Sequence, residues 1–140
     1  MDYEPNNINV IEYLVQYYWS KKQYREFTQL PIIQFSPQTY KTGAQNYYNY
    51  RAMAFNLSGE KDSAFANIKI AIDINPNNPI PQTTLAEIYA MNGDEDKFYA
   101  ILEKAFVMGF NSAYLTPNEL PYSRFAGKKR YEDLLKKYRK

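Results

Sequence analysis

The sequence contains neither cysteine nor histidine, and these two absences exclude several classes of site. Without cysteine, the chain forms no disulfide and offers no thiolate as a nucleophile or metal ligand. Without histidine, it lacks the commonest general base and the commonest ligand of transition metals. The side chains left for catalysis are carboxylates, lysine, serine, threonine and tyrosine.

The acidic residues do not form a catalytic or metal-binding pattern. The densest acids stand at the starts of expected helices, where negative charge favours the helix dipole. No glycine-rich phosphate loop or metal-spaced cluster is present. We therefore predict that the chain is not an enzyme and needs no cofactor and no metal. The acids at the starts of the expected helices are Glu60, Asp62, Asp94, Glu95 and Asp96.

The net charge is also small, because 17 basic and 15 acidic residues leave a net charge of +2. A dedicated nucleic-acid binder is usually far more basic. A late basic run fits either a phosphate-contacting helix or the solvated outer face of a final helix, and Glu132 and Asp133 interrupt it. We favour the solvated face and expect no nucleic-acid partner. The run comprises Lys128, Lys129, Arg130, Lys136, Lys137, Arg139 and Lys140.

No apolar run approaches the length of a membrane span. The first residues, Met1 to Pro5, lack the basic-then-apolar layout of a signal peptide. We therefore expect no membrane insertion. The compartment stays open, as does the question of whether the chain is an excised domain of a longer protein.

Aromatic residues are abundant, with fifteen Tyr, eight Phe and one Trp. Such side chains serve either as wedges between packed helices or as a tyrosine-rich binding surface. We favour the wedges.

A 34-residue repeat dominates the sequence, because residues 47–76 are echoed by residues 81–110. Small residues recur where backbones approach, and bulky apolar residues recur where a core is filled. A fixed period of this length is typical of stacked helical hairpins, which mostly bind other polypeptides. The matched pairs include Ala52 with Ala86, Phe55 with Tyr89, Gly59 with Gly93, Ile68 with Leu102 and Ala71 with Ala105.

The pattern predicts an all-α chain and no strand, even for the β-prone run Tyr47–Tyr50. Ser20 with Gln23 fits a capping box for a second helix, which Pro31 should bend or end early. Ser36 and Pro37 fit the start of a third helix. The expected helices cover residues 8–20, 21–34, 37–57, 60–74, 79–91, 95–108 and 128–140, with about one turn beginning at Thr116 and a frayed segment at residues 1–7.

The repeat resembles the tetratricopeptide repeat (TPR) family. The first clear repeat matches at Tyr48, Ala52, Phe55, Gly59, Ala64, Ile68, Ala71 and Pro76, and the next at Leu85, Ala86, Tyr89, Gly93, Leu102 and Ala105. Arg51 stands where the family usually has Leu. Phe98 stands where it has a small residue, so we expect the second hairpin to splay or shift there. Gly109 and Phe110 replace the closing proline.

The resemblance implies one domain, residues 1–140, built as a right-handed α-α superhelix of about three hairpins with a C-terminal capping helix. Its expected parts are a loose first hairpin (1–36), two clear repeats (37–76 and 77–110) and a tail (111–140). That tail resembles the segment that closes many bacterial TPR domains.

TPR hairpins line a concave groove with their first helices. The resemblance implies that asparagines there hold the backbone of an extended peptide, while methionine offers an adaptable apolar contact. The alternative is that these asparagines are merely solvated. Some TPR domains bind the carboxylate terminus of a partner through a clamp of Lys, Asn and Arg. The corresponding groove positions here hold other residues, so we predict no such clamp. The implied groove residues are Asn46, Asn49, Met53 and Asn56, then Ile80, Thr83, Glu87 and Ala90.

We therefore predict a non-catalytic protein–protein interaction module that binds a peptide segment or a neighbouring domain in its groove. The alternative is a structural oligomerisation or intramolecular docking domain of a larger bacterial protein. Self-association would use exposed aromatic residues such as Tyr3, Tyr13, Tyr40 and Tyr47.

Overall fold

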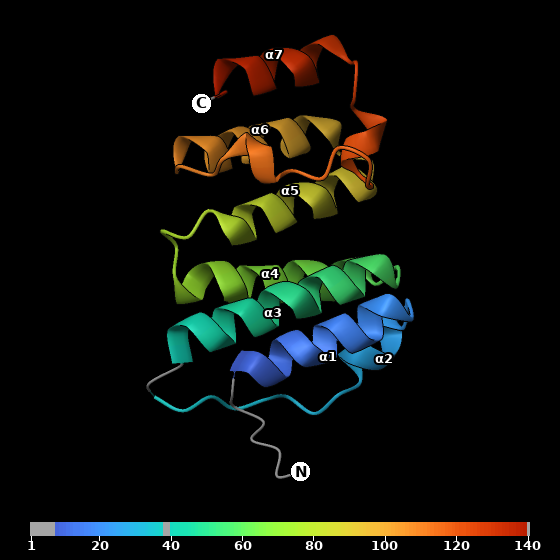
Figure 1. The fold of residues 1–140 in the computed structure, drawn as a ribbon, viewed down its shortest axis with the longest axis vertical. Helices are drawn as coiled ribbons and strands as arrows, with labels where there is room; N and C mark the ends of the chain where they lie inside the picture. The colour runs from blue at the N-terminus through green and yellow to red at the C-terminus, as the bar shows by residue number, and fades with distance from the viewer. Residues whose placement is uncertain (1–7, 38–39, 140) are drawn as a thin grey trace. The chain divides into compact units, whose positions relative to one another are not determined.

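The computed structural model describes residues 8–37 and 40–139 (Figure 1). The described residues form seven α-helices and two short 3₁₀ helices, and they include no strand, which confirms the all-α prediction. The chain divides into two compact units, Met1–Pro76 and Asn77–Lys140. The frayed segment predicted at residues 1–7 lies outside the described residues.

The N-terminal unit contains α1 (Ile8–Ser20), α2 (Tyr24–Thr28), α3 (Tyr40–Leu57) and α4 (Lys61–Ile74). The prediction for α1 is confirmed. Ile11, Ile33 and Tyr47 form a buried cluster. Beside α2, the Trp19 ring meets the rings of Tyr24 and Phe27 edge-on, with centroids 5.2 Å apart in each pair. Aromatic rings here act as wedges between helices, as the sequence suggested.

The prediction for the second helix is wrong in length, because α2 ends at Thr28 rather than near residue 34. The expected capping box does not form. The Ser20 hydroxyl donates to the Tyr17 carbonyl oxygen at 2.8 Å, and the Gln23 side chain makes no capping bond. Residues 29–36 have no regular structure, since Pro31 disfavours helical geometry in the residue before it.

The third helix also differs from the prediction. Pro37 lies in a turn, residues 38 and 39 lie outside the described residues, and α3 is helical from Tyr40. Gly43 lies inside α3 and is buried without breaking the helix.

The two hairpins close with the same backbone geometry. Gly59 has φ +80° and Gly93 has φ +83°, a left-handed conformation that glycine adopts readily. In both turns the glycine N–H donates to the carbonyl oxygen three residues earlier at 3.1 Å. The next N–H donates to the carbonyl oxygen five residues before it at 2.9 Å. The sequence repeat is therefore reproduced in the hydrogen bonds that end α3 and α5.

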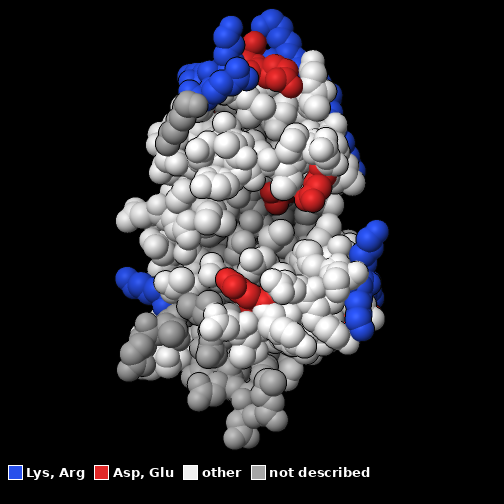
Figure 2. All heavy atoms as spheres, in the orientation of Figure 1, with Lys and Arg blue, Asp and Glu red and all other residues white. Residues whose placement is uncertain are grey.

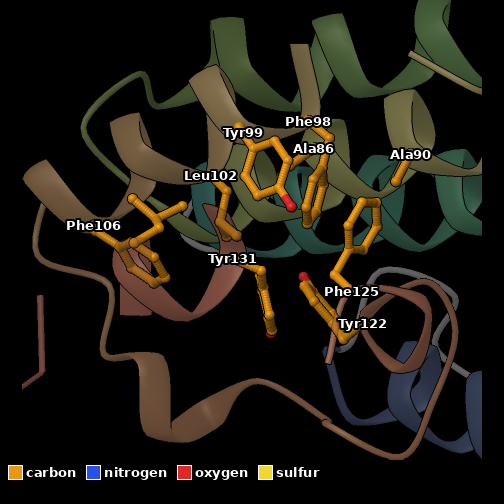
Figure 3. Close-up of a cluster of buried hydrophobic side chains, with 10 residues drawn as sticks. Ala86, Ala90, Phe98, Tyr99, Leu102, Phe106, Tyr122, Phe125 and Tyr131 are labelled. Atoms are coloured by element: carbon orange, nitrogen blue, oxygen red, sulfur yellow. The ribbon is translucent and has the colours of Figure 1, made fainter. Parts of the chain in front are cut away.

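The C-terminal unit contains α5 (Ile80–Met91), α6 (Glu95–Val107), η1 (Ser112–Tyr114), η2 (Tyr122–Arg124) and α7 (Lys129–Lys137). The segment at Thr116 forms a turn rather than a helix. Tyr131 of α7 (Figure 3) and Leu134 are buried in the core cluster of this unit, and the role of α7 as a cap stays a prediction. The buried cluster comprises Ala86, Ala90, Phe98, Tyr99, Leu102, Phe106, Tyr122, Phe125, Tyr131 and Leu134.

Candidate binding face

The predicted groove residues belong to two helices in different compact units. Asn46, Asn49, Met53 and Asn56 lie on α3 of the N-terminal unit, and Thr83, Glu87 and Ala90 lie on α5 of the C-terminal unit, with Ile80 at its start.

The α3 residues form one polar stripe. Their spacings of three, four and three residues place them along a single helix face. Asn46, Met53 and Asn56 are half-buried, whereas Asn49 is only 7% exposed. The Asn49 amide nitrogen lies 3.9 Å from the Met53 sulfur, as a weak donor to it. We call these four residues the α3 stripe.

The amide oxygen of Asn49 is buried and has no hydrogen-bond partner in the described part of the chain. A buried acceptor without a donor costs roughly 1–3 kcal/mol. The stripe therefore contains an amide oxygen that is shielded from solvent and has no donor in the described fold.

A glutamine next to the stripe holds α3 against α4. The buried Gln45 amide nitrogen donates to the carbonyl oxygens of Ala71 at 2.8 Å and Asn75 at 3.0 Å, at the end of α4. Sequence reasoning missed Gln45, because a lone helical glutamine is usually solvated and gives no distinguishing signal.

Arg51, the departure from the family pattern, links α3 to α2. Its guanidinium donates to the Thr28 carbonyl oxygen at 3.2 Å and to the Tyr47 hydroxyl at 3.3 Å. It also lies over the Phe55 ring, 5.1 Å from the centroid. The longer side chain thus serves a structural contact within the N-terminal unit.

The α5 residues are all engaged within their own unit. The Thr83 hydroxyl donates to the Ile80 carbonyl oxygen at 2.7 Å, one turn earlier on the helix. Ala90 is buried in the core cluster. The Glu87 carboxylate accepts a hydrogen bond of 2.6 Å from the Tyr122 hydroxyl of η2. Their assignment as ligand contacts stays a prediction.

Burial strongly affects the pKa of the Glu87 carboxyl. The pKa of its carboxyl is raised to about 7: desolvation is the main cause, the Tyr122 hydrogen bond opposes it, and the charge of Glu119 adds to it. Burial and the Glu87 charge raise the pKa of Tyr122 far above its usual value, so the tyrosine remains a neutral donor. Tyr122 was not singled out from the sequence, since no local pattern brings it to Glu87.

The basic run of the tail mostly faces acids. Arg130 pairs with Asp96 at 2.7 Å and Lys137 with Glu103 at 3.0 Å, both across α6 and α7. The Arg130 guanidinium also lies 4.2 Å from the Tyr99 ring centroid. Figure 2 shows the resulting mixture of basic and acidic side chains over α7. Exclusion of nucleic acid nevertheless stays a prediction.

Among the described residues, no group of three or more acidic side chains is arranged to hold a metal ion. Within the same residues, no helix combines the length and apolar character needed to cross a membrane. Comparisons with protein-family models, curated proteins and solved structures find no significant match.

Proposed function

We propose that the chain is a TPR-like, non-catalytic interaction module that binds an extended protein segment, or a neighbouring domain, along the α3 stripe. The observation that supports this function best is the buried amide oxygen of Asn49, which has no partner among the described residues. The family resemblance of the 34-residue repeat points to the same use of this helix.

The chemistry of the stripe suits a peptide backbone. The Asn49 oxygen is shielded from solvent in the described fold, so a backbone N–H of the ligand would reach it after the flexible Met53 side chain moves aside. From Asn46 to Asn56 the stripe is about 15 Å long, which matches roughly four to five residues of extended chain. A contact of this size supports modest affinity.

The test is selection from a display library of random ten-residue peptides, followed by fluorescence anisotropy of the selected peptides. We expect Asn49→Ala to weaken binding by on the order of ten-fold, since one hydrogen bond is lost. Lys69→Ala, at an exposed position on α4, is the matched control and should bind normally. Selected peptides that bind Asn49→Ala and the parent chain equally would refute the stripe.

Self-association is the second candidate, favoured by exposed aromatic residues. Tyr13 is 67% exposed and Tyr40 is 53% exposed, whereas Tyr47 is 1% exposed and is therefore excluded from any such surface. Tyr3 lies outside the described residues. A concentration-dependent mass in light scattering that Tyr13→Ser abolishes would support this alternative, and a constant monomer mass would eliminate it.

A further inference from the structure

A partly buried carboxylate and a buried tyrosine meet between α5 and the tail. Tyr122 is 2% exposed and its hydroxyl donates to Glu87 at 2.6 Å. Tyr122 belongs to η2, which lies within the segment 116–126, hereafter the η2 segment. Glu119 of the same segment adds a second carboxylate whose charge acts on Glu87.

Among the described residues of the C-terminal unit, the groups that act on the pKa of Glu87 are neutral or negative. Tyr122 and Glu119 act on Glu87 from the η2 segment, and Tyr131 of α7 acts on Tyr122. Tyr89, the other titratable residue of α5, lies under the Lys97 ammonium group, 5.3 Å from its ring centroid. In the described part of the chain, no lysine or arginine forms an ion pair with Glu87.

We propose that Glu87 and Tyr122 form a pH-sensitive latch, in which protonated Glu87 holds the η2 segment on α5 and loss of that proton weakens the hold. The proton removes a poorly solvated negative charge that is repelled by Glu119. The protonated carboxyl of Glu87 still has an oxygen that accepts from the Tyr122 hydroxyl. The closed state therefore keeps this hydrogen bond when Glu87 is protonated.

The direction of the pH effect follows from the linkage between proton binding by Glu87 and closure of the η2 segment. The pKa of Glu87 is raised from 4.5 to about 7 in the closed structure. The stabilisation is therefore fully present below about pH 4.5 and is lost as the pH rises through about 7. With these two values, the equilibrium constant for opening increases about 70-fold between pH 5 and pH 8.

In a second tyrosine–glutamate contact of the same unit, the pKa of the glutamate is shifted in the opposite direction. Glu103 accepts from the Tyr138 hydroxyl at 3.1 Å and from the Lys137 ammonium at 3.0 Å. The Lys137 hydrogen bond lowers the pKa of Glu103. This carboxyl does not take up a proton near neutral pH, and Glu103→Gln is therefore the matched control for Glu87→Gln.

The experiment is amide hydrogen exchange of the full chain at pH 5 and pH 8, corrected for the intrinsic exchange rate. The reporters are the N–H groups of Ser123, Phe125 and Ala126, which donate within the η2 segment at 2.9, 3.0 and 3.2 Å. We expect their protection to fall about 70-fold from pH 5 to pH 8 in the parent chain. The fall should persist in Glu103→Gln and disappear in Glu87→Gln, which keeps an acceptor oxygen.

Protection that does not change with pH in the parent chain would overturn the latch, as would an unchanged fall in Glu87→Gln. If Glu87→Gln does not fold, the carbon-13 resonance of the Glu87 carboxyl in the parent chain decides. A midpoint near 7 supports the latch, and a midpoint near 4.5 overturns it. These readouts do not involve the α3 stripe, so peptide binding and the latch fail independently.

Discussion

The hairpins α3–α4 and α5–α6 differ most clearly at one pair of equivalent positions. Ala64 in α4 and Phe98 in α6 stand 34 residues apart and are both 0% exposed. The small Ala64 side chain is fully buried on α4, a helix that packs against α3. The Phe98 ring instead stacks on Phe125 of the tail, with centroids 4.2 Å apart and planes 17° apart (Figure 3).

The remaining core positions of the two hairpins agree closely. Ala52 and Ala86 are both 0% exposed, and Ile68 and Leu102 are equally buried at 1% and 0%. The contrast at Phe98 is therefore specific to one position. One large residue, at a position where the first hairpin has alanine, therefore gives the second hairpin a surface against which the tail packs. The expected splaying of that hairpin at Phe98 stays a prediction.

The largest effect should come from Phe98→Ala. The change removes the ring that meets Phe125, Tyr122 and Tyr131, and it should cost about 3–5 kcal/mol of unfolding free energy. Urea unfolding followed by far-UV circular dichroism measures the loss. Val107→Ala, on the same helix but 69% exposed, is the control and should cost little. Equal small losses in the two variants would contradict the role given to Phe98.

The reverse exchange, Ala64→Phe, should also destabilise the chain. Ala64 is fully buried, so the added ring should overpack the core at a cost of about 1–3 kcal/mol. The same urea titration applies, with Ala66→Phe at an exposed position of α4 as the control. An unchanged midpoint for Ala64→Phe would show that the two hairpins tolerate a large residue equally.

A smaller loss is expected for Gln45→Ala, because Ala71 and Asn75 lose a shared donor at the end of α4. We expect a cost of about 1–2 kcal/mol in urea unfolding. Gln45→Glu should be at least as harmful, since a carboxylate cannot donate to either carbonyl. Stability within about 0.3 kcal/mol of the parent chain would show that water replaces Gln45 at no cost.

The smallest effect should be that of Glu103→Gln, which removes an exposed ion pair with Lys137. We expect a loss of about 0.2–1 kcal/mol that shrinks at high salt. Because the folded-state pKa of Glu103 is lowered, this contribution is present at neutral pH and is lost as the pH falls through that value. A loss that grows with salt or vanishes at neutral pH would contradict the assignment.

The sequence predicted most of the helices because their signals are local. The period, the glycines after α3 and α5 and the amphipathic pattern of α7 each lie within a few neighbouring residues. The second helix was overestimated because its apolar residues continue past Thr28, while the chain leaves helical geometry before Pro31.

The candidate site could be predicted only in part. The family resemblance implied Asn46, Asn49, Met53 and Asn56 as groove residues, and their spacing puts them on one face of α3. The contacts of Gln45 and Tyr122 were not predictable, because they join residues 26 to 35 positions apart through the packing of separate helices. Burial of Glu87 likewise depends on the tail fold, and a single glutamate in a helical repeat gives no sign of it.

A double-mutant cycle on Phe98 and Phe125 tests most directly whether the tail closes the second hairpin. Phe98→Ala, Phe125→Ala and the double variant would be compared with the parent chain by urea unfolding. Because the two rings stack, we predict a coupling energy of about 0.5–1.5 kcal/mol or more. Additive losses, within about 0.3 kcal/mol, would contradict the account by showing that Phe98 is stabilised without the tail.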